Sequence, residues 1–397
     1  MNMHITSGNT KLYSKEGNVM IIMNLEADNF FAFKNFHMNM SYPKKIVDSY
    51  IAGEYLKDRE NFRYKKVNVL MGGNASGKTT VGLLLMTVCN FMAKKESAKL
   101  AEKICDRKRE ATVSIDFVMK QLKLYRVDIR VIPVSMNEDG YRVEVCTRIA
   151  NIAKNDRYET CVKKIERLPL KYKREYIEEL EKLEPIGWMF SYPSDLSGKK
   201  ISCPQTPEFE QILDYTLRAL DPSITGVEKS KEVENTFIVH MESGDVIIQD
   251  GETIRENILS SGTKAGIVIA DMISSIYAGV YGFYYCDEQF SYIHSDLEKA
   301  LLNVMIHGLR DTDQLFFTTH NSDILDLPLP KHSFSFLKKD VNDPLQPIKC
   351  VCASDYLKRN TDSIRNAVEN DLFSAAPNLD LIYKIAELRE ETGDDYS

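Results

Sequence analysis

An octapeptide at residues 72–79, G-G-N-A-S-G-K-T, constrains the fold of this 397-residue chain more than any other part of its sequence. It matches the pattern G-x-x-x-x-G-K-[ST], follows the β-rich run 66–71, and precedes an apolar helical pattern. In that context glycines let the backbone curl, so that successive N–H groups and the helix N-terminus face phosphate oxygens. The sequence therefore predicts a nucleotide-binding loop between a strand and a helix of an α/β domain.

The loop residues have separate expected roles. Lys78 would reach the β- and γ-phosphates of ATP, and the Thr79 hydroxyl would bind Mg²⁺. The residues expected to surround the nucleotide are Gly72, Gly73, Asn74, Ala75, Ser76, Gly77, Lys78, Thr79 and Thr80.

A second motif is the run V-Y-G-F-Y-Y-C-D-E at residues 280–288, an apolar strand pattern that ends in two adjacent acids. Asp287 is expected to hold Mg²⁺ through water, and Glu288 to orient and deprotonate the attacking water. The alternative is a surface turn with two solvated acids. The aromatic strand before the acids favours the first interpretation, a Walker B element.

A histidine follows another strand pattern, at residues 314–319. Parallel strands that end beside the phosphates would bring the His320 imidazole near the γ-phosphate, where it could donate a hydrogen bond. A single histidine after a strand is a weak signal by itself. His320 is a candidate catalytic residue because only one helical pattern separates it from Glu288.

Residues 259–263, L-S-S-G-T, begin a helical pattern upstream of the acidic pair. A Ser-Ser-Gly sequence at that place can be a plain N-cap, whose hydroxyl satisfies free N–H groups of the first turn. Together with the other three motifs it is typical of an ABC-type signature. Ser260, Ser261 and Gly262 would then contact a nucleotide held by another subunit, so that ATP joins two copies of the chain.

Composition narrows the class of protein. A hydrophobic share of 43% and a charged share of 27% are ordinary for a globular protein. The net charge of −7 argues against attraction of nucleic acid by the whole surface and leaves a local basic patch open. The eight scattered cysteines predict reduced thiols and a cytoplasmic location. No apolar run approaches the ~18 residues that span a bilayer, and the N-terminus lacks the apolar region of a secretory signal.

The order of the patterns predicts an α/β fold, a P-loop NTPase of ABC-head type. Its mixed central sheet would be joined by an antiparallel β layer and a helical insertion. The expected segments are a polar tail at 1–19, the first part of the ATPase domain at 20–150, the helical insertion at 151–233 and the second part at 234–397.

At these motifs the sequence resembles the ABC/SMC-like ATPases related to RecF and to the ATPase halves of OLD-family nucleases. Within that group it is most similar to the stand-alone ATPases of bacterial anti-phage systems, such as PARIS-like and Septu-like systems. Beside G-G-N-A-S-G-K-T-T, the segments that carry the resemblance are L-S-S-G-T-K-A-G (259–266), C-D-E-Q-F-S-Y-I-H-S-D-L (286–297), T-T-H-N-S-D-I-L (318–325), L-E-A-D-N-F-F-A-F-K-N-F (25–36) and V-E-N-D-L-F-S-A-A-P-N-L-D (368–380).

The resemblance implies ATP and Mg²⁺ as cofactors, catalysis by Glu288, γ-phosphate sensing by His320, and a head-to-head dimer closed by Ser260 and Gly262. The residues after His320 are too few for a TOPRIM nuclease module, and no long coiled coil is visible. The implied role is a slow regulatory ATPase that oligomerises, senses infection and holds or activates a separately encoded nuclease or toxin. The alternative is a RecF-like DNA-repair ATPase that clamps DNA.

The sequence differs from ABC transporter subunits in two motifs, and both differences disfavour a transporter function. Ser261 and Thr263 stand where transporter signatures have Gly and Gln, and the segment after Glu288 differs from the transporter D-loop. The glutamine of the family's Q-loop has two weak candidates, Gln205 and Gln211.

Overall fold

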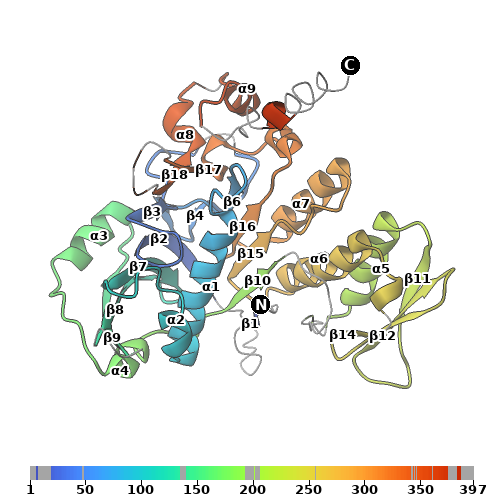
Figure 1. Cartoon of the computed structure of the whole chain (residues 1–397), viewed down its shortest axis with the longest axis horizontal. Coiled ribbons are helices and arrows are strands. Elements are labelled where there is room, and N and C mark those ends of the chain that lie inside the picture. The colour runs from blue at the N-terminus through green and yellow to red at the C-terminus, as the bar shows by residue number, and fades with distance from the viewer. Residues whose placement is uncertain are drawn as a thin grey trace, which may run out of the picture.

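The computed structural model describes residues 6–7, 19–46, 49–134, 140–192, 201, 206–254, 256–340, 343, 345, 347–359, 361–373 and 382–385. Figure 1 shows a larger body that contains the central sheet, and a smaller lobe built on β11, β12 and β14 beside α5. Helix α6 extends from this lobe to the body. Among the described residues, no helix is long and apolar enough to cross a membrane.

A mixed sheet of seven strands forms the centre of the body, in the order β1-β10-β15-β16-β6-β17-β18. These strands are β1 (Thr6–Ser7), β10 (Trp188–Ser191), β15 (Phe283–Asp287), β16 (Gln314–Thr318), β6 (Val67–Met71), β17 (Phe334–Lys339) and β18 (Ile348–Cys352). The five strands from β10 to β17 are parallel, whereas β1 and β18 pair antiparallel at the edges. Strands β6, β15 and β16 are buried at every position, as expected for parallel strands covered on both faces.

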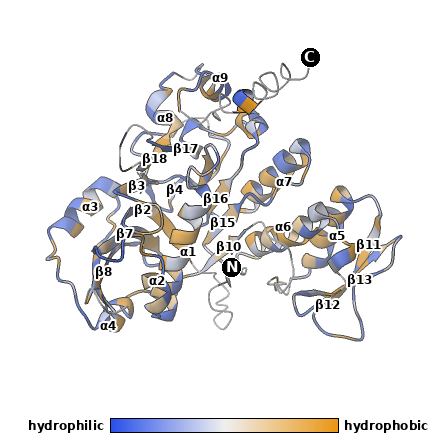
Figure 2. Ribbon diagram, in the orientation of Figure 1, coloured by the Kyte–Doolittle hydropathy of each residue, from blue (hydrophilic) through white to orange (hydrophobic). Residues whose placement is uncertain are grey.

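Alternate residues of β15 face two different cores. Phe283 and Tyr285 pack with α1 (Lys78–Lys94) and with the antiparallel layer. Tyr284 and Cys286 pack with α6 (Ser261–Tyr277) and α7 (Ser295–Gly308) on the other face. Figure 2 shows the corresponding hydrophobic residues along β15 and on the helices next to it.

The predicted antiparallel layer is a five-stranded sheet in the order β3-β2-β7-β8-β9. Its strands are β3 (Phe36–Asn39), β2 (Ile21–Asp28), β7 (Ala111–Met119), β8 (Lys123–Pro133) and β9 (Tyr141–Asn151). The body also contains β4 (Tyr55–Leu56), β5 (Arg59–Arg63), α2 (Ala98–Ala101), α3 (Tyr158–Glu166), α4 (Tyr176–Leu180), α8 (Ala353–Tyr356) and α9 (Ile364–Glu369), with short 3₁₀ turns at Ser322–Asp326 and Lys331–Ser333. A third 3₁₀ turn, at Glu256–Ile258, packs with the lobe.

The lobe has its own small core. Its four-stranded sheet, β11 (Ile224–Lys229), β12 (Thr236–Met241), β13 (Val246–Gln249) and β14 (Glu252–Ile254), packs with α5 (Phe209–Leu220). Helix α6 belongs to both cores: Ile267, Val268 and Ala270 pack in the lobe, and Ile269 and Met272 pack in the body. The helix that carries the predicted signature therefore connects the lobe to the central sheet.

The helical insertion predicted for 151–233 needs a partial correction. The segment contains α3, α4 and α5, but also β10 in the central sheet and β11 in the lobe. Strand β10 is a short, fully buried run, which periodicity alone cannot distinguish from a segment of a buried helix, and β11 has only six residues. Within the predicted polar tail, Thr6 and Ser7 pair with β10, so these two residues extend the sheet.

Candidate nucleotide-binding and catalytic site

Three predicted motifs meet at the carboxyl edge of the central sheet. Strand β6 leads into the P-loop, β15 ends at Asp287 and β16 ends at Thr318. The strands are neighbours in the order β15-β16-β6, with Asp287 paired to Thr318 and Thr318 paired to Leu70. Open parallel sheets bind ligands at this edge.

The backbone of the P-loop has the conformation that its glycines predict. Gly72, Ala75 and Gly77 have φ angles of 150°, 60° and 104°. A Cβ on Gly72 would lie 2.4 Å from the Leu337 carbonyl oxygen, so glycine is required there for space as well as for conformation. The Ser76 hydroxyl is buried without a hydrogen-bond partner among the described residues. Such an atom is expected in a loop whose partner is a ligand.

Gly82 sets how closely α1 approaches β15. A Cβ at this position would lie 2.5 Å from Cε1 and 2.8 Å from Cζ of the Tyr285 ring. The Tyr285 hydroxyl in turn donates a hydrogen bond to the Lys78 carbonyl oxygen, at 2.7 Å. The buried ring thus holds the first turn of α1 against the Walker B strand.

We expect Gly82→Ala to lower the free energy of unfolding by about 1–3 kcal/mol, because overpacking against the ring outweighs a helix-propensity gain of about 1 kcal/mol. Urea denaturation would measure the difference. Gly226→Ala is the matched control, since a Cβ there meets only Asp214 Oδ1, at 3.9 Å. Equal stability of the two variants would contradict the role given to Gly82.

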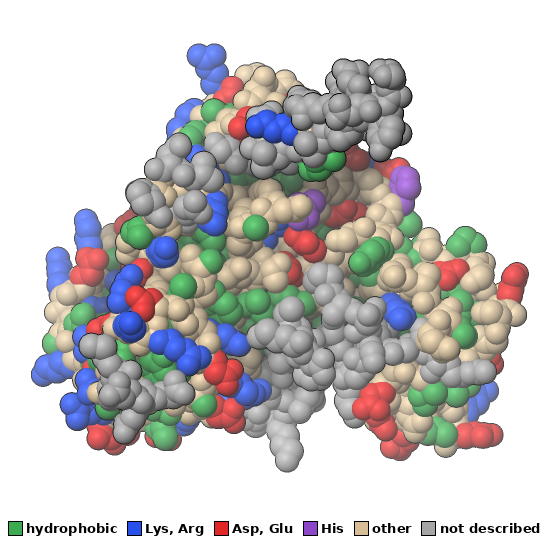
Figure 3. All heavy atoms as spheres, in the orientation of Figure 1, with side chains coloured by type: hydrophobic (Ala, Val, Ile, Leu, Met, Phe, Trp, Pro, Cys, Tyr) green, Lys and Arg blue, Asp and Glu red, His purple; other side chains and the backbone are tan. Residues whose placement is uncertain are grey.

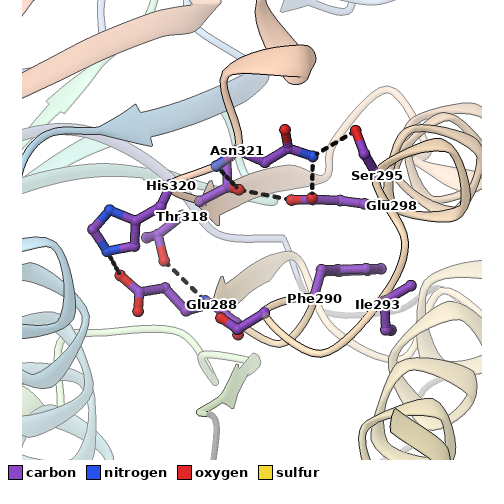
Figure 4. Close-up of a pocket in the computed structure, with 10 residues that line it drawn as sticks. Glu288, Phe290, Ile293, Ser295, Glu298, Thr318, His320 and Asn321 are labelled. Atoms are coloured by element: carbon purple, nitrogen blue, oxygen red, sulfur yellow. Dashed lines mark hydrogen bonds and ion pairs between the residues drawn. The ribbon is translucent and has the colours of Figure 1, made fainter.

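The predicted catalytic side chains converge on the P-loop lysine. Lys78 Nζ lies 2.9 Å from the Gly72 carbonyl oxygen, 3.1 Å from His320 Nε2 and 3.4 Å from Glu288 Oε1. Glu288 Oε1 also lies 2.9 Å from His320 Nε2, and Figure 4 shows these two side chains pointing toward each other. Burial lowers the pKa of Lys78, and the Glu288 carboxylate opposes this effect. Figure 3 shows a histidine next to acidic side chains on the visible face of the body.

Glu288 has a strained backbone. Its φ of 45° lies in the left-handed region, which costs a non-glycine residue about 1–2 kcal/mol. The strain is held by Thr318, whose carbonyl oxygen and hydroxyl both accept from the Glu288 N–H, at 3.2 and 3.0 Å. Strain of this kind is common at active sites. Here it accompanies the turn that directs the Glu288 side chain toward Lys78 and His320.

The predicted metal ligands fit Mg²⁺. Asp287 is fully buried; its Oδ1 accepts from the Thr318 hydroxyl at 2.6 Å, while Oδ2 has no hydrogen-bond partner among the described residues. Burial raises the pKa of Asp287, and the hydroxyls of Thr318 and Thr79 oppose the rise. Mg²⁺ is usually bound by one or two carboxylates together with phosphate oxygens and waters. The free Asp287 oxygen and the nearby Thr79 hydroxyl match that set.

The predicted signature forms the N-terminus of α6. Ser260 is the N-cap: its hydroxyl accepts from the Thr263 N–H at 3.1 Å and lies 2.7 Å from the Thr263 hydroxyl. The Thr263 hydroxyl donates to Asp221 Oδ2 at 2.8 Å. Ser260, Ser261 and Gly262 do not line the cavity beside Glu288 and His320. The N-cap interpretation is thus correct for this chain, and a role toward a second subunit stays a prediction.

Of the two candidates for the Q-loop glutamine, only Gln211 can be placed, and it does not line the cavity beside Glu288 and His320. Gln205 is outside the described residues, and Gln211 lies on α5 in the lobe. Strand β10, which pairs with β15 on the side away from β16, ends at Ser191. Ser191 pairs with Cys286, and its buried hydroxyl has no hydrogen-bond partner within the described chain. Ser191 was not predicted because the four-residue strand β10 that positions it has no local signal in the sequence.

A cavity of about 440 Å³ adjoins Glu288 and His320, and sequence analysis missed several of its polar residues. Glu298, Ser295, Thr319 and Asn321 line it and are joined by hydrogen bonds (Figure 4). The sequence signal that could have indicated these residues is the pair of polar side chains, Thr319 and Asn321, on either side of His320.

Comparison with known proteins identifies the fold. No family model and no curated protein matches the sequence. The Smc head domain with an extended coiled coil from Pyrococcus furiosus, bound to the C-terminal domain of ScpA, matches with a TM-score of 0.50 and 11% identity, over 85% of this chain and 98% of that chain. The recombination mediator protein RecF matches with a TM-score of 0.41 and 10% identity, over 85% and 100% of the two chains.

The Smc head match confirms the predicted fold class. This chain has the ABC-type P-loop ATPase fold, with a mixed central sheet and an antiparallel layer, and residues 72–79, Asp287, Glu288 and His320 lie at the carboxyl edge of that central sheet.

Proposed function

We propose that this protein binds ATP with Mg²⁺ and hydrolyses it slowly, in a site that a second copy of the chain completes. The observation that carries the proposal is the convergence of Lys78, Glu288 and His320, which come from three separate motifs, beside the strained turn at Glu288. The fold supports the same function.

Each side chain has a defined task. Lys78 binds the β- and γ-phosphates, exchanging its contacts with Gly72, Glu288 and His320 for phosphate oxygens. Glu288 orients the attacking water and accepts its proton, and His320 donates a hydrogen bond to the γ-phosphate. Thr79 and Asp287 would hold Mg²⁺, which neutralises charge on the phosphates.

The signature is the reason for proposing a shared site. Ser260, Ser261 and Gly262 lie at the N-terminus of a 17-residue helix, outside the cavity beside Glu288. A helix N-terminus favours phosphate. We infer that this one contacts the γ-phosphate bound by a partner copy, so that assembly controls hydrolysis and turnover is slow.

Mixing two inactive variants tests the shared site. Lys78→Ala should inactivate the P-loop of its own chain, and Ser260→Arg should inactivate the signature. A mixed dimer of the two contains one intact composite site, so we expect about a quarter of the parental ATPase rate at an equal ratio. Each variant alone, assayed at the same total concentration, is the control. If mixing restores no activity while the parental protein is active, the site is not shared in this way.

For its biological role, we propose a cytoplasmic regulatory ATPase of an anti-phage system, which uses oligomerisation to sense infection and to hold or activate a separate nuclease or toxin. The sequence resemblance supports this role. Copurification with the product of the adjacent gene and protection of cells against phage would test it. ATP-dependent DNA binding without a protein partner would instead favour a RecF-like DNA clamp.

A further inference from the structure

Glu298 is a buried carboxylate whose two oxygens bind the two residues that flank His320. It lies in the first turn of α7 and is 3% exposed. Its Oε1 accepts from the Thr319 hydroxyl at 2.7 Å, and its Oε2 accepts from Asn321 Nδ2 at 2.6 Å. Figure 4 shows Glu298 pointing from α7 toward Asn321, across the cavity from Glu288.

These bonds fix the backbone on both sides of His320. The Thr319 hydroxyl also accepts from the Asn321 N–H at 2.9 Å, and Asn321 Oδ1 accepts from the Asp323 N–H at 2.9 Å. Asn321 Nδ2 makes a second bond to the Ser295 hydroxyl, at 3.0 Å. The chain that follows β16 is therefore tied to α7 through polar groups on both sides of the histidine.

The His320 side chain needs such support because packing does not hold it. It is 42% exposed, and its ring is in contact with Lys78 and Glu288, both of which would also contact ATP. The direction of the ring therefore depends on the backbone at 319–321. A displacement of about 1 Å in a reacting group can reduce a rate about 100-fold.

Fold stability alone does not account for a carboxylate at this position. Burying a charged group is costly, and burial raises the pKa of Glu298 while Asn321 and Thr319 oppose the rise. Among the described residues no cation forms an ion pair with Glu298, so its burial is offset by hydrogen bonds to Thr319 and Asn321.

We propose that Glu298 is a positioning residue for ATP hydrolysis, which holds His320 opposite Glu288 through Thr319 and Asn321. This inference rests on the proposed ATPase function. It predicts that Glu298 affects the chemical step and leaves ATP binding unchanged, because it contacts neither the P-loop nor the predicted metal ligands.

The test compares Glu298→Leu with Glu298→Gln. Leucine removes both acceptors. Glutamine keeps an acceptor for Asn321, and its amide can donate to the Thr319 hydroxyl, which can act as donor or acceptor. Asp296→Asn is the matched control, because Asp296 is an exposed acid in the same turn of α7 that pairs with Lys299. Steady-state ATPase kinetics, MgATP affinity by calorimetry and melting temperature are measured for each.

We expect kcat of Glu298→Leu to fall about 10- to 100-fold, with MgATP affinity within about twofold of the parent. Glu298→Gln should retain kcat within about threefold, and Asp296→Asn should match the parent within about twofold. Since Glu298 acts through His320, adding Glu298→Leu to His320→Ala should give no further loss. Asn321→Leu, which removes one of the two ties, should give a smaller loss than Glu298→Leu.

Three results would overturn the proposal: parental kcat in Glu298→Leu, a Glu298→Gln variant as slow as Glu298→Leu, or an equal further loss when Glu298→Leu is placed in the His320→Ala background. Failure of the proposed function is distinguishable, because the parental protein and Asp296→Asn would then show no ATPase activity. If Glu298→Leu does not fold, Asn321→Leu replaces it: its kcat is compared with that of the parent, and Asn321→Leu in the His320→Ala background is compared with His320→Ala alone.

Discussion

Glu288→Gln is expected to bind MgATP with unchanged affinity and to hydrolyse it about 10²- to 10⁴-fold more slowly than the parent, the usual contribution of a general base. The physical reason is the position of the carboxylate at the end of β15. Glu288 Oε1 lies 3.4 Å from Lys78 Nζ and 2.9 Å from His320 Nε2, where the γ-phosphate and its attacking water would lie. The glutamine side chain has the same shape but cannot accept the proton.

The same variant should accumulate as an ATP-bound dimer. If the nucleotide joins two copies, a copy that cannot hydrolyse ATP stays closed. Size-exclusion chromatography with multi-angle light scattering, with and without MgATP, measures this shift, and single-turnover assays measure hydrolysis. Asp296→Asn serves as the control, because Asp296 is an exposed acid in the first turn of α7 that pairs with Lys299. A Glu288→Gln protein that hydrolyses ATP at the parental rate would show that another group is the base.

Local features of the fold were readable from sequence because they depend on neighbours in the chain. The strand–loop–helix around Lys78 follows from glycines placed between a β-rich run and an apolar helix. The strand pattern at 314–319 is Gln314–Thr318 in the structure, so both of its ends were placed within one residue. The strand pattern at 280–288 is Phe283–Asp287 in the structure, so the acidic end of the motif was placed closely and its beginning was not.

Features that depend on distant contacts were missed. Strand β10 has four residues and is defined by pairing with β15 almost a hundred positions later, which no local pattern reports. In sequence, Glu298 is an ordinary acid in the first turn of a helix, a position that favours acids through the helix dipole. Its burial and its bonds to Thr319 and Asn321 arise only when α7 packs beside the end of β16. Asp221 was missed for the same reason: its hydrogen bond to the Thr263 hydroxyl, at the start of α6, joins residues that are far apart in the sequence.

Lys78→Ala should weaken MgATP binding about 10- to 100-fold or more, since a charge-assisted hydrogen bond contributes about 1.5–3 kcal/mol. The Lys78 side chain is 4% exposed and its ammonium is held at 2.9 Å from the Gly72 carbonyl oxygen, within the loop itself. Isothermal titration calorimetry with MgATP measures the affinity, and ATPase activity should be lost with it.

The control for Lys78→Ala is Lys94→Ala, which removes an exposed lysine from the last turn of the same helix. It should bind MgATP as the parent does. The melting temperature of Lys78→Ala decides whether lost affinity reflects lost folding. We expect the variant to fold, because Glu288 and His320 also contact each other, at 2.9 Å in the parental protein, and each would keep that partner. A folded Lys78→Ala protein with parental affinity would mean that the loop at 72–79 does not hold the phosphates, and the assignment of Glu288 and His320 would fail with it.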